Sequence, residues 1–520
     1  MFNGQVLRKY YIGTLSATAF FMPLSVWLLT FFIITIVLVW IADGGLMRIV
    51  DLRKDKISIL IFSGTYLVYA VWMIKTSDLS FGLRELKLKL PLLIFPLVIG
   101  LSQPLNKKEI KIILSFFIAG VVLSSLIGII AYSFGKDLSD IDNPRKISPF
   151  ISHIRLALMT NFSVVCSAWY YVSDTTRKNR FIYLVAAIWL TVFLFLLLSL
   201  TGIIIFAVLL IVSLVLVVRR SQNGILKISL ILIVVASLIL SIFFISGEIK
   251  SFYKKGSAYS YPLKTKTANG NPYLHYPDRK DIENGNFVWI YLNEEELRKE
   301  WNSRSSIKYD SSDLRNQKLR YTIIRYLTSA GLTKDSAGLA KLRNIDIRYI
   351  ENGITNILFT QGKPFKSRIY EIIWQIDYYL KGGNLSGHSV TQRIEYLEKG
   401  WHLYGDNILM GTGTGDVKHE FINQFSKENS LLESQFIYLP HNQFLTFLIS
   451  FGIIGFLIIS CSILIPAVMK KVFRSFLFDC FFIIILLSML GEDTLETHPG
   501  VSFFAYFYSL YVFGNIMDEL

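Results

Sequence analysis

The sequence contains two long apolar stretches, GIIIFAVLLIVSLVLVV from Gly202 to Val218 and ISLILIVVASLILSIFFI from Ile228 to Ile245. Neither holds a charged residue, and each is about long enough to cross a bilayer as a helix. Over the whole chain, 52% of the residues are hydrophobic and only 18% are charged. Because a single soluble core cannot accommodate so large an apolar share, the composition predicts a polytopic membrane protein.

Turn and charge breaks around these stretches predict an all-α fold of about twelve transmembrane helices. The expected helices lie at residues 11–24, 25–42, 57–74, 88–102, 110–134, 152–173, 181–199, 202–218, 225–246, 442–468, 473–490 and 498–516. One large polar segment separates the ninth helix from the tenth. The expected parts are therefore helices 1–9 in residues 1–246, a loop domain in 247–440, and helices 10–12 in 441–520.

Alternate loops between the predicted helices are rich in Lys and Arg, and the positive-inside rule places those loops in the cytoplasm. They include Arg53 and Lys54, Lys107 and Lys108, Arg177 and Lys178, Arg219 and Arg220, and Lys470 and Lys471. The segment 247–440 then lies on the extracytoplasmic side. It carries 27 Lys/Arg and 22 Asp/Glu, so most of the net charge of +15 flanks the helices. That distribution indicates topology signals and membrane lipids rather than nucleic acid as a partner.

Two expected outer loops break this pattern. One holds Lys75, Arg84, Lys87 and Lys89, and the other holds Lys136, Arg145 and Lys146. Two interpretations stay open: these loops are exceptions to a statistical rule, or their cations meet the anionic head group of a lipid.

The loop domain is expected to be folded and mainly helical. A short strand is predicted over 287–292, and helices over 294–301, 319–329, 367–380 and 391–404. In the last helix Ile394, Leu397, Trp401 and Tyr404 form one apolar stripe, which can lie on the membrane or on neighbouring helices.

Several polar residues stand near the expected membrane boundary. His441, in Pro440-His441-Asn442, marks the place where the chain re-enters the bilayer, and an imidazole there can accept a proton from a hydroxyl. His388 precedes the striped helix and could belong to a polar site or simply to a loop.

The segment 491–498 groups three carboxylates with an imidazole. An acidic outer loop is ordinary, so we expect no metal there. Glu492 could bind an acceptor sugar. The run Gly411 to Gly415 lacks the Lys-Ser/Thr of a P-loop and predicts a tight turn.

The order of these motifs resembles the O-antigen ligase family, which also includes O-antigen polymerases and bacterial protein O-oligosaccharyltransferases. The resemblance rests on 389–401, on the turn 411–416, on Pro440-His441-Asn442-Gln443-Phe444-Leu445 and on Phe451-Gly452-Ile453-Ile454-Gly455. The helix count, the late periplasmic loop and the paired opening helices agree with it.

The resemblance implies a glycosyltransferase that moves a glycan from undecaprenyl diphosphate to an acceptor hydroxyl at the periplasmic face of the inner membrane. No cofactor, metal or nucleotide sugar is implied. Carried over, Arg393 would bind the diphosphate and His441 would be catalytic. A guanidinium suits this role because its fork binds phosphate oxygens bidentately.

This chain departs from the family at one position. Members often carry a Ser-Arg pair at the outer turn between two middle helices, whereas here the matching stretch is Leu198-Ser199-Leu200-Thr201-Gly202. We expect Arg155 to substitute for the missing arginine, with Arg84 and Lys87 as further candidates.

The leading functional hypothesis is therefore ligation of O-antigen to the lipid A core, a step of lipopolysaccharide biosynthesis. The same chemistry with another acceptor would make the protein a polysaccharide polymerase or a protein O-oligosaccharyltransferase. A membrane transporter is the alternative from a different class, although the halves of the chain show no internal repeat.

Overall fold

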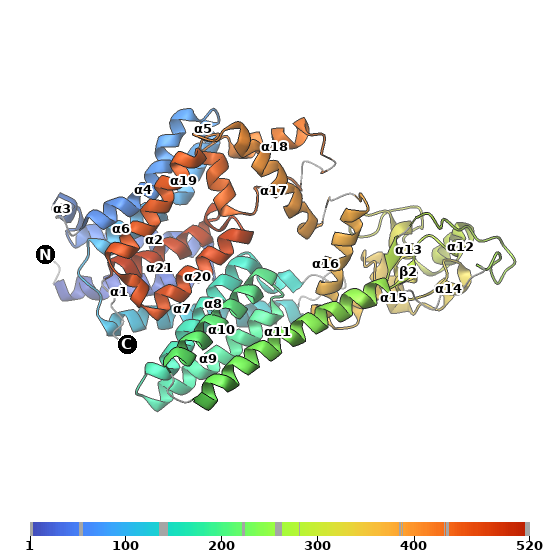
Figure 1. The fold of residues 1–520 in the computed structure, drawn as a ribbon, viewed down its shortest axis with the longest axis horizontal. Helices are drawn as coiled ribbons and strands as arrows, with labels where there is room; N and C mark the ends of the chain where they lie inside the picture. The colour runs from blue at the N-terminus through green and yellow to red at the C-terminus, as the bar shows by residue number, and fades with distance from the viewer. Residues whose placement is uncertain are drawn as a thin grey trace. The chain divides into compact units, whose positions relative to one another are not determined.

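The computed structural model describes residues 4–50, 56–134, 144–220, 224–254, 263–279, 281–383, 386, 388–430, 432 and 436–514. The chain divides into two compact units, which Figure 1 shows to be mainly helical. Unit 1 comprises Met1–Ile130, Ile147–Ser213 and Leu385–Leu520, and unit 2 comprises Ala131–Lys146 and Leu214–Asn384. Residues 385–440, assigned above to the loop domain, thus group with unit 1, and residues 214–246 group with unit 2. Which segments lie outside the membrane stays a prediction.

Unit 1 contains most of the apolar helices. They are α1 (Gly4–Phe21), α2 (Val26–Ala42), α3 (Gly45–Val50), α4 (Ile57–Val71), η2 (Trp72–Lys75), α5 (Leu79–Lys89), α6 (Pro91–Gly100), α7 (Lys107–Phe134), η4 (Pro144–Ile147), α8 (His153–Ser173), α9 (Arg177–Leu196), α10 (Leu200–Arg220), α17 (Ser389–Asp406), α18 (Val417–Lys427), α19 (Gln443–Met469), η7 (Val472–Arg474), α20 (Phe476–Gly491), η8 (Thr494–Glu496) and α21 (His498–Phe513). Of these, α7, η4 and α10 cross the boundary to unit 2.

Four described helical stretches are long and apolar enough to cross a membrane: Ile57–Lys75, Lys107–Phe134, Arg177–Leu196 and Gln443–Met469. Shorter apolar helices run over Val26–Ala42, Leu200–Leu216 and Phe476–Gly491. Each segment predicted to cross the membrane overlaps a helix, and the structure is mostly helical, which is consistent with an all-α membrane protein. The number of helices that cross the membrane stays a prediction.

The core of unit 1 forms around α21, which is buried from Gly500 to Phe513. Aromatic side chains surround it, with the ring of Phe62 stacked on that of Tyr508 at 4.4 Å between centroids. The Tyr506 hydroxyl donates to the carbonyl of Leu15 at 2.8 Å. Packing of this last helix against α1 and α4 thus ties the two ends of the sequence into one bundle.

The helix α19 is interrupted at Gly452, whose φ of +62° and ψ of −171° leave the helical region. The segment that follows α17 supplies the missing backbone partners. Thr412 N and Gly413 N donate to the carbonyls of Ile449 and Ser450 at 2.8 and 2.9 Å. A Cβ on Gly452 would lie 2.3 Å from the carbonyl of Leu409, which is why a glycine is needed there. The segment 411–415, predicted as a tight turn, is non-helical and turns at its end, and its bonds attach the chain between α17 and α18 to α19.

Unit 2 contains α11 (Gly224–Tyr253), β1 (Ile282–Glu283), β2 (Asn286–Phe287), α12 (Glu294–Arg304), α13 (Leu319–Ser329), α14 (Ser336–Ala340), α15 (Asn344–Glu351), η5 (Ile357–Thr360) and α16 (Pro364–Leu380). The two strands form an antiparallel hairpin. Trp301, Tyr309 and Tyr326 are fully buried in its core. The predicted helices of the loop domain are confirmed. The predicted strand over 287–292 is wrong beyond Phe287, because, of the later residues, Leu292 makes isolated bridges to Leu274 and Lys334 instead of a continuous ladder.

Candidate active site

Four residues singled out from the sequence meet at one end of the apolar helices of unit 1. Arg155 lies in the first turn of α8, Arg393 near the start of α17, His441 just before α19, and Glu492 just after α20. The Glu492 carboxylate is shared by both guanidiniums: Oε1 contacts Arg393 Nη2, and Oε2 lies 3.4 Å from Arg155 Nη1. Two arginines from different helices thus converge on one carboxylate.

The two arginines differ in how firmly they are held. Arg155 Nη2 donates to the carbonyl of Asp493 at 2.8 Å and Nε donates to Thr497 Oγ1 at 3.1 Å. Only 7% of the Arg155 side chain is exposed, compared with 35% for Arg393. Arg155 is therefore fixed inside the cluster, while Arg393 is the guanidinium that a ligand can reach.

The backbone holds His441 in an unusual conformation. Its φ is +54°, a left-handed value that is rare for a residue with a side chain. The amide of His441 donates to Asp493 Oδ2 at 2.8 Å, which stabilises this turn. The imidazole Nδ1 is buried without a hydrogen-bond partner and lies 3.6 Å from Glu492 Oε2. The side chain as a whole is 30% exposed, so a ligand can contact it.

The charges around Glu492 set its ionisation. Burial alone would raise the pKa of Glu492, but the His441 imidazole and the guanidiniums of Arg393 and Arg155 outweigh burial and lower it to about 2. Burial raises the pKa of the neighbouring Asp493, even though Thr446 Oγ1 donates to it at 2.5 Å. Glu492 is therefore a carboxylate at neutral pH and a permanent counter-ion for the two arginines.

A second charged cluster, which the sequence analysis did not identify, lies next to the first. Lys89, at the end of α5, is fully buried; its Nζ lies 2.5 Å from Glu496 Oε2 and donates to the carbonyl of Leu495, also at 2.5 Å. Gln443 Nε2 donates to Glu496 Oε1 at 2.8 Å, and Tyr69 OH at 3.3 Å. These contacts from Lys89 and Gln443 fix the position of the turn between Glu492 and Glu496. Glu85 and Lys89, four residues apart on one helix face, were the available sequence signal.

The structure places the remaining candidates on α5 and at the start of α17. Arg84 and Lys87 are exposed on α5, and their role as further candidates for the missing arginine stays a prediction. His388 lies at the N-terminal end of α17, where its carbonyl accepts from Gln392 N at 3.0 Å. Of the outer-loop cations, Lys89 is buried and so does not face a lipid head group, whereas Lys75 is exposed and contacts the carbonyl of Gly411.

The carboxylates of the 491–498 loop each have a different partner. Glu492 contacts the arginines, Asp493 accepts from Thr446, and Glu496 accepts from Lys89. Among the described residues no group of three or more His, Cys, Asp or Glu side chains converges as a metal site would. Glu492 and Glu496 thus pair with cations of the protein itself, and Asp493 with a hydroxyl.

Glu85 gives the second cluster a pH dependence. Burial is the main cause that raises the pKa of Glu85, to about 7. A carboxyl whose pKa is raised in the folded state contributes stability below its ordinary pKa of about 4.5 and loses it as the pH rises through about 7. We expect thermal unfolding of Glu85→Gln to match wild type at pH 5 and to occur a few degrees higher than wild type at pH 8. Glu398→Gln, at an exposed position of α17, is the control, and an equal pH slope in wild type and Glu85→Gln would contradict the assignment.

The geometry defines a helical, apolar protein with two arginines, a histidine and a carboxylate assembled where four of its helices end. Residues 350–460, which include Arg393, His441 and the interrupted part of α19, match the family model described as O-antigen ligase. This match over part of the chain supports the resemblance to the O-antigen ligase family. No curated protein matches the chain. The family and the apolar helices indicate a membrane protein of ligase or polymerase type, hence a glycosyltransferase-type enzyme that acts on glycan or lipid-linked substrates.

Proposed function

We propose that the protein transfers a glycan from undecaprenyl diphosphate to a hydroxyl of the lipid A core, at the periplasmic face of the bacterial inner membrane. The observation that carries the proposal is the convergence of Arg155 and Arg393 on Glu492, beside His441. A leaving diphosphate requires fixed positive charge, and the paired guanidiniums provide it.

Arg393 would be the first contact of the donor. Its guanidinium is partly exposed and bound by a single carboxylate, so phosphate oxygens can take up its remaining N–H groups. Arg155, which is buried, would hold Glu492 in place and add positive charge next to it. This division of roles explains how the cluster could work without an arginine near Leu200.

His441 would then act on the acceptor. Its buried Nδ1 faces Glu492, which favours the tautomer with the proton on Nδ1 and leaves Nε2 free to take a proton. The acceptor oxygen attacks the anomeric carbon, the bond from that carbon to the diphosphate oxygen breaks, and the hydroxyl proton goes to Nε2. Glu492 stabilises the imidazolium that forms. The 3.6 Å separation is longer than a hydrogen bond, and such contacts often shorten only when substrate binds. In-line attack of this kind would invert the anomeric centre.

The test compares His441→Ala and Arg393→Ala with wild type in a strain that lacks the chromosomal copy. We expect both variants to lose capped lipopolysaccharide and to accumulate glycan on the lipid carrier, because loss of general-base or charge stabilisation costs about 10²–10⁴ in rate. His419→Ala, on an exposed residue of α18, and Arg84→Ala are the matched controls.

Normal capping in His441→Ala or Arg393→Ala at normal protein level would overturn the proposal. Chains that stay short in the deletion strain would instead indicate a polymerase, and loss of glycan from proteins would indicate a protein O-oligosaccharyltransferase.

A further inference from the structure

One side of α17 is apolar and exposed. Its exposed apolar residues continue into the segment that follows the helix, and five of them have between 41% and 64% of their surface accessible: Ile394, Trp401, Ile408, Leu409 and Met410. Leu397 and Tyr404 lie between them on the same side of the helix and are half-buried. We call these seven residues the outer stripe.

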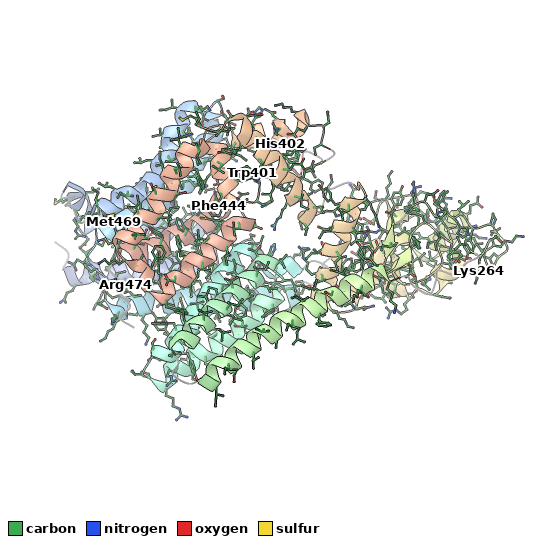
Figure 2. The ribbon with its side chains drawn as sticks, viewed as in Figure 1. Lys264, Trp401, His402, Phe444, Met469 and Arg474 are labelled. Carbon is green, nitrogen blue, oxygen red and sulfur yellow. The ribbon has the colours of Figure 1, made fainter. Side chains whose placement is uncertain are left out.

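The other sides of α17 have different characters. Tyr396, Gly400 and Leu403 form a buried side. A Cβ on Gly400 would come within 2.8 Å of Leu445 Cδ2 of α19, and the ring of Tyr396 lies 6.0 Å from that of Phe425 of α18. The side opposite the outer stripe is polar, and there His402 Nδ1 contacts Glu428 at 2.9 Å. Trp401 and His402, labelled in Figure 2, thus belong to two surfaces of opposite polarity on one helix. This is the pattern of a helix that lies at a boundary between apolar and aqueous surroundings.

The outer stripe is continuous with the apolar surface of α19. Ile453 N and Ile454 N donate to the carbonyls of Ile408 and Leu409 at 2.8 and 3.3 Å, so the end of the stripe is fixed beside the interruption of α19. From there Ile454, Leu457 and Ile458 continue as exposed apolar residues along a helix long enough to cross a membrane.

The same end of the stripe is also attached to α4. Trp72 Nε1, just past the end of α4, donates to the carbonyl of Met410 at 2.7 Å. The stripe is thus anchored at the level where a membrane-crossing helix ends.

From these contacts we infer that α17 is a membrane-surface helix whose outer stripe lies in lipid, just below the head groups of the leaflet that borders the active-site cluster. Trp401 and Tyr404 suit that depth because their rings are amphipathic. Arg393 lies four residues before Leu397, at the edge of the stripe, with its guanidinium on Glu492. If the proposed function holds, a lipid-borne diphosphate can reach Arg393 sideways from the bilayer. The lipid contact itself does not depend on the reaction.

The experiment measures lipid exposure directly. Single cysteines are introduced at Ile394, Leu397 and Trp401, and as matched controls at Glu398 and His402 on the polar side. The background is Cys461→Ala, since Cys461 is exposed whereas Cys166 and Cys480 are buried. The full chain is labelled with a nitroxide and placed in vesicles of phosphatidylethanolamine and phosphatidylglycerol. Accessibility to oxygen, which concentrates in lipid, is compared with accessibility to a water-soluble nickel chelate.

We expect the three stripe positions to be several-fold more accessible to oxygen than to nickel, and the two control positions to show the reverse order. Nickel-accessible labels on the stripe would show that this side of α17 faces water and would overturn the inference. Exclusion of both reagents from the stripe would overturn it as well, because another part of the protein would then cover this surface. Neither result would bear on the proposed function, which the activity of the His441 and Arg393 variants tests separately.

Discussion

Lys89→Met should destabilise the protein more than any other single change considered above. The Lys89 side chain is fully buried, and its Nζ meets Glu496 Oε2 at 2.5 Å. Removing one partner of a buried ion pair leaves the other charge uncompensated, which typically costs about 3–5 kcal/mol. In a bundle of this size that corresponds to a fall in the unfolding temperature of roughly 4–7 °C. Thermal unfolding in detergent, followed by circular dichroism, measures it.

Lys87→Met provides the matched control, because Lys87 is on the same helix and exposed. We expect it to unfold at the wild-type temperature. The double variant Lys89→Met/Glu496→Gln removes both charges and should recover much of the loss, since the uncompensated carboxylate is gone. Equal unfolding temperatures for Lys89→Met and Lys87→Met would show that the pair does not support the fold.

Arg155→Ala should lower kcat/KM for glycan transfer by about 10- to 100-fold. The estimate follows from the loss of hydrogen bonds to charged groups, worth about 1.5–3 kcal/mol, at 1.4 kcal/mol per factor of ten. Without Arg155, Glu492 loses the contact at 3.4 Å that holds it between Arg393 and His441. The measurement is transfer from purified lipid-linked glycan in vesicles, with the concentration of donor varied.

Two further variants decide whether Arg155 supplies the missing arginine of the family. Arg155→Lys keeps the charge but cannot make the three separate contacts to Glu492, Asp493 and Thr497, so we expect a partial recovery, mainly in kcat. Arg84→Ala should leave transfer unchanged because Arg84 is exposed on α5. If Arg155→Ala behaved like Arg84→Ala while folding normally, Arg155 would have no part in the reaction.

Much of the candidate site could be predicted from local sequence signals. Arg393 and His441 stand in recognisable motifs, and Arg155 and Glu492 stand beside the ends of apolar stretches. The buried cluster around Lys89 could not be found in this way. In the sequence Lys89 is one of several cations in an outer loop. In the structure it is buried next to Glu496, whereas Lys87, two residues earlier, is exposed.

The interruption of α19 illustrates a similar limit. The apolar run from Phe444 predicts one continuous helix, and a glycine alone does not disclose a break. The break is stable because Ile408 and Leu409, from a segment about 45 residues earlier, supply the acceptors that Ile453 and Ile454 would otherwise lack.

By itself, the sequence determined that this protein is built from apolar helices, where most of them begin and end, and which residue types stand at the boundary of the membrane. Those properties follow from hydropathy, periodicity and charge, which are local along the chain. Only the tertiary structure decided that Arg155 and Arg393 share Glu492, because the contact between Arg155 and Glu492 joins positions 337 residues apart. It also decided that the apolar stripe of α17 faces outward rather than into the protein. Contacts of this kind depend on how helices pack, and packing is a property of the whole fold.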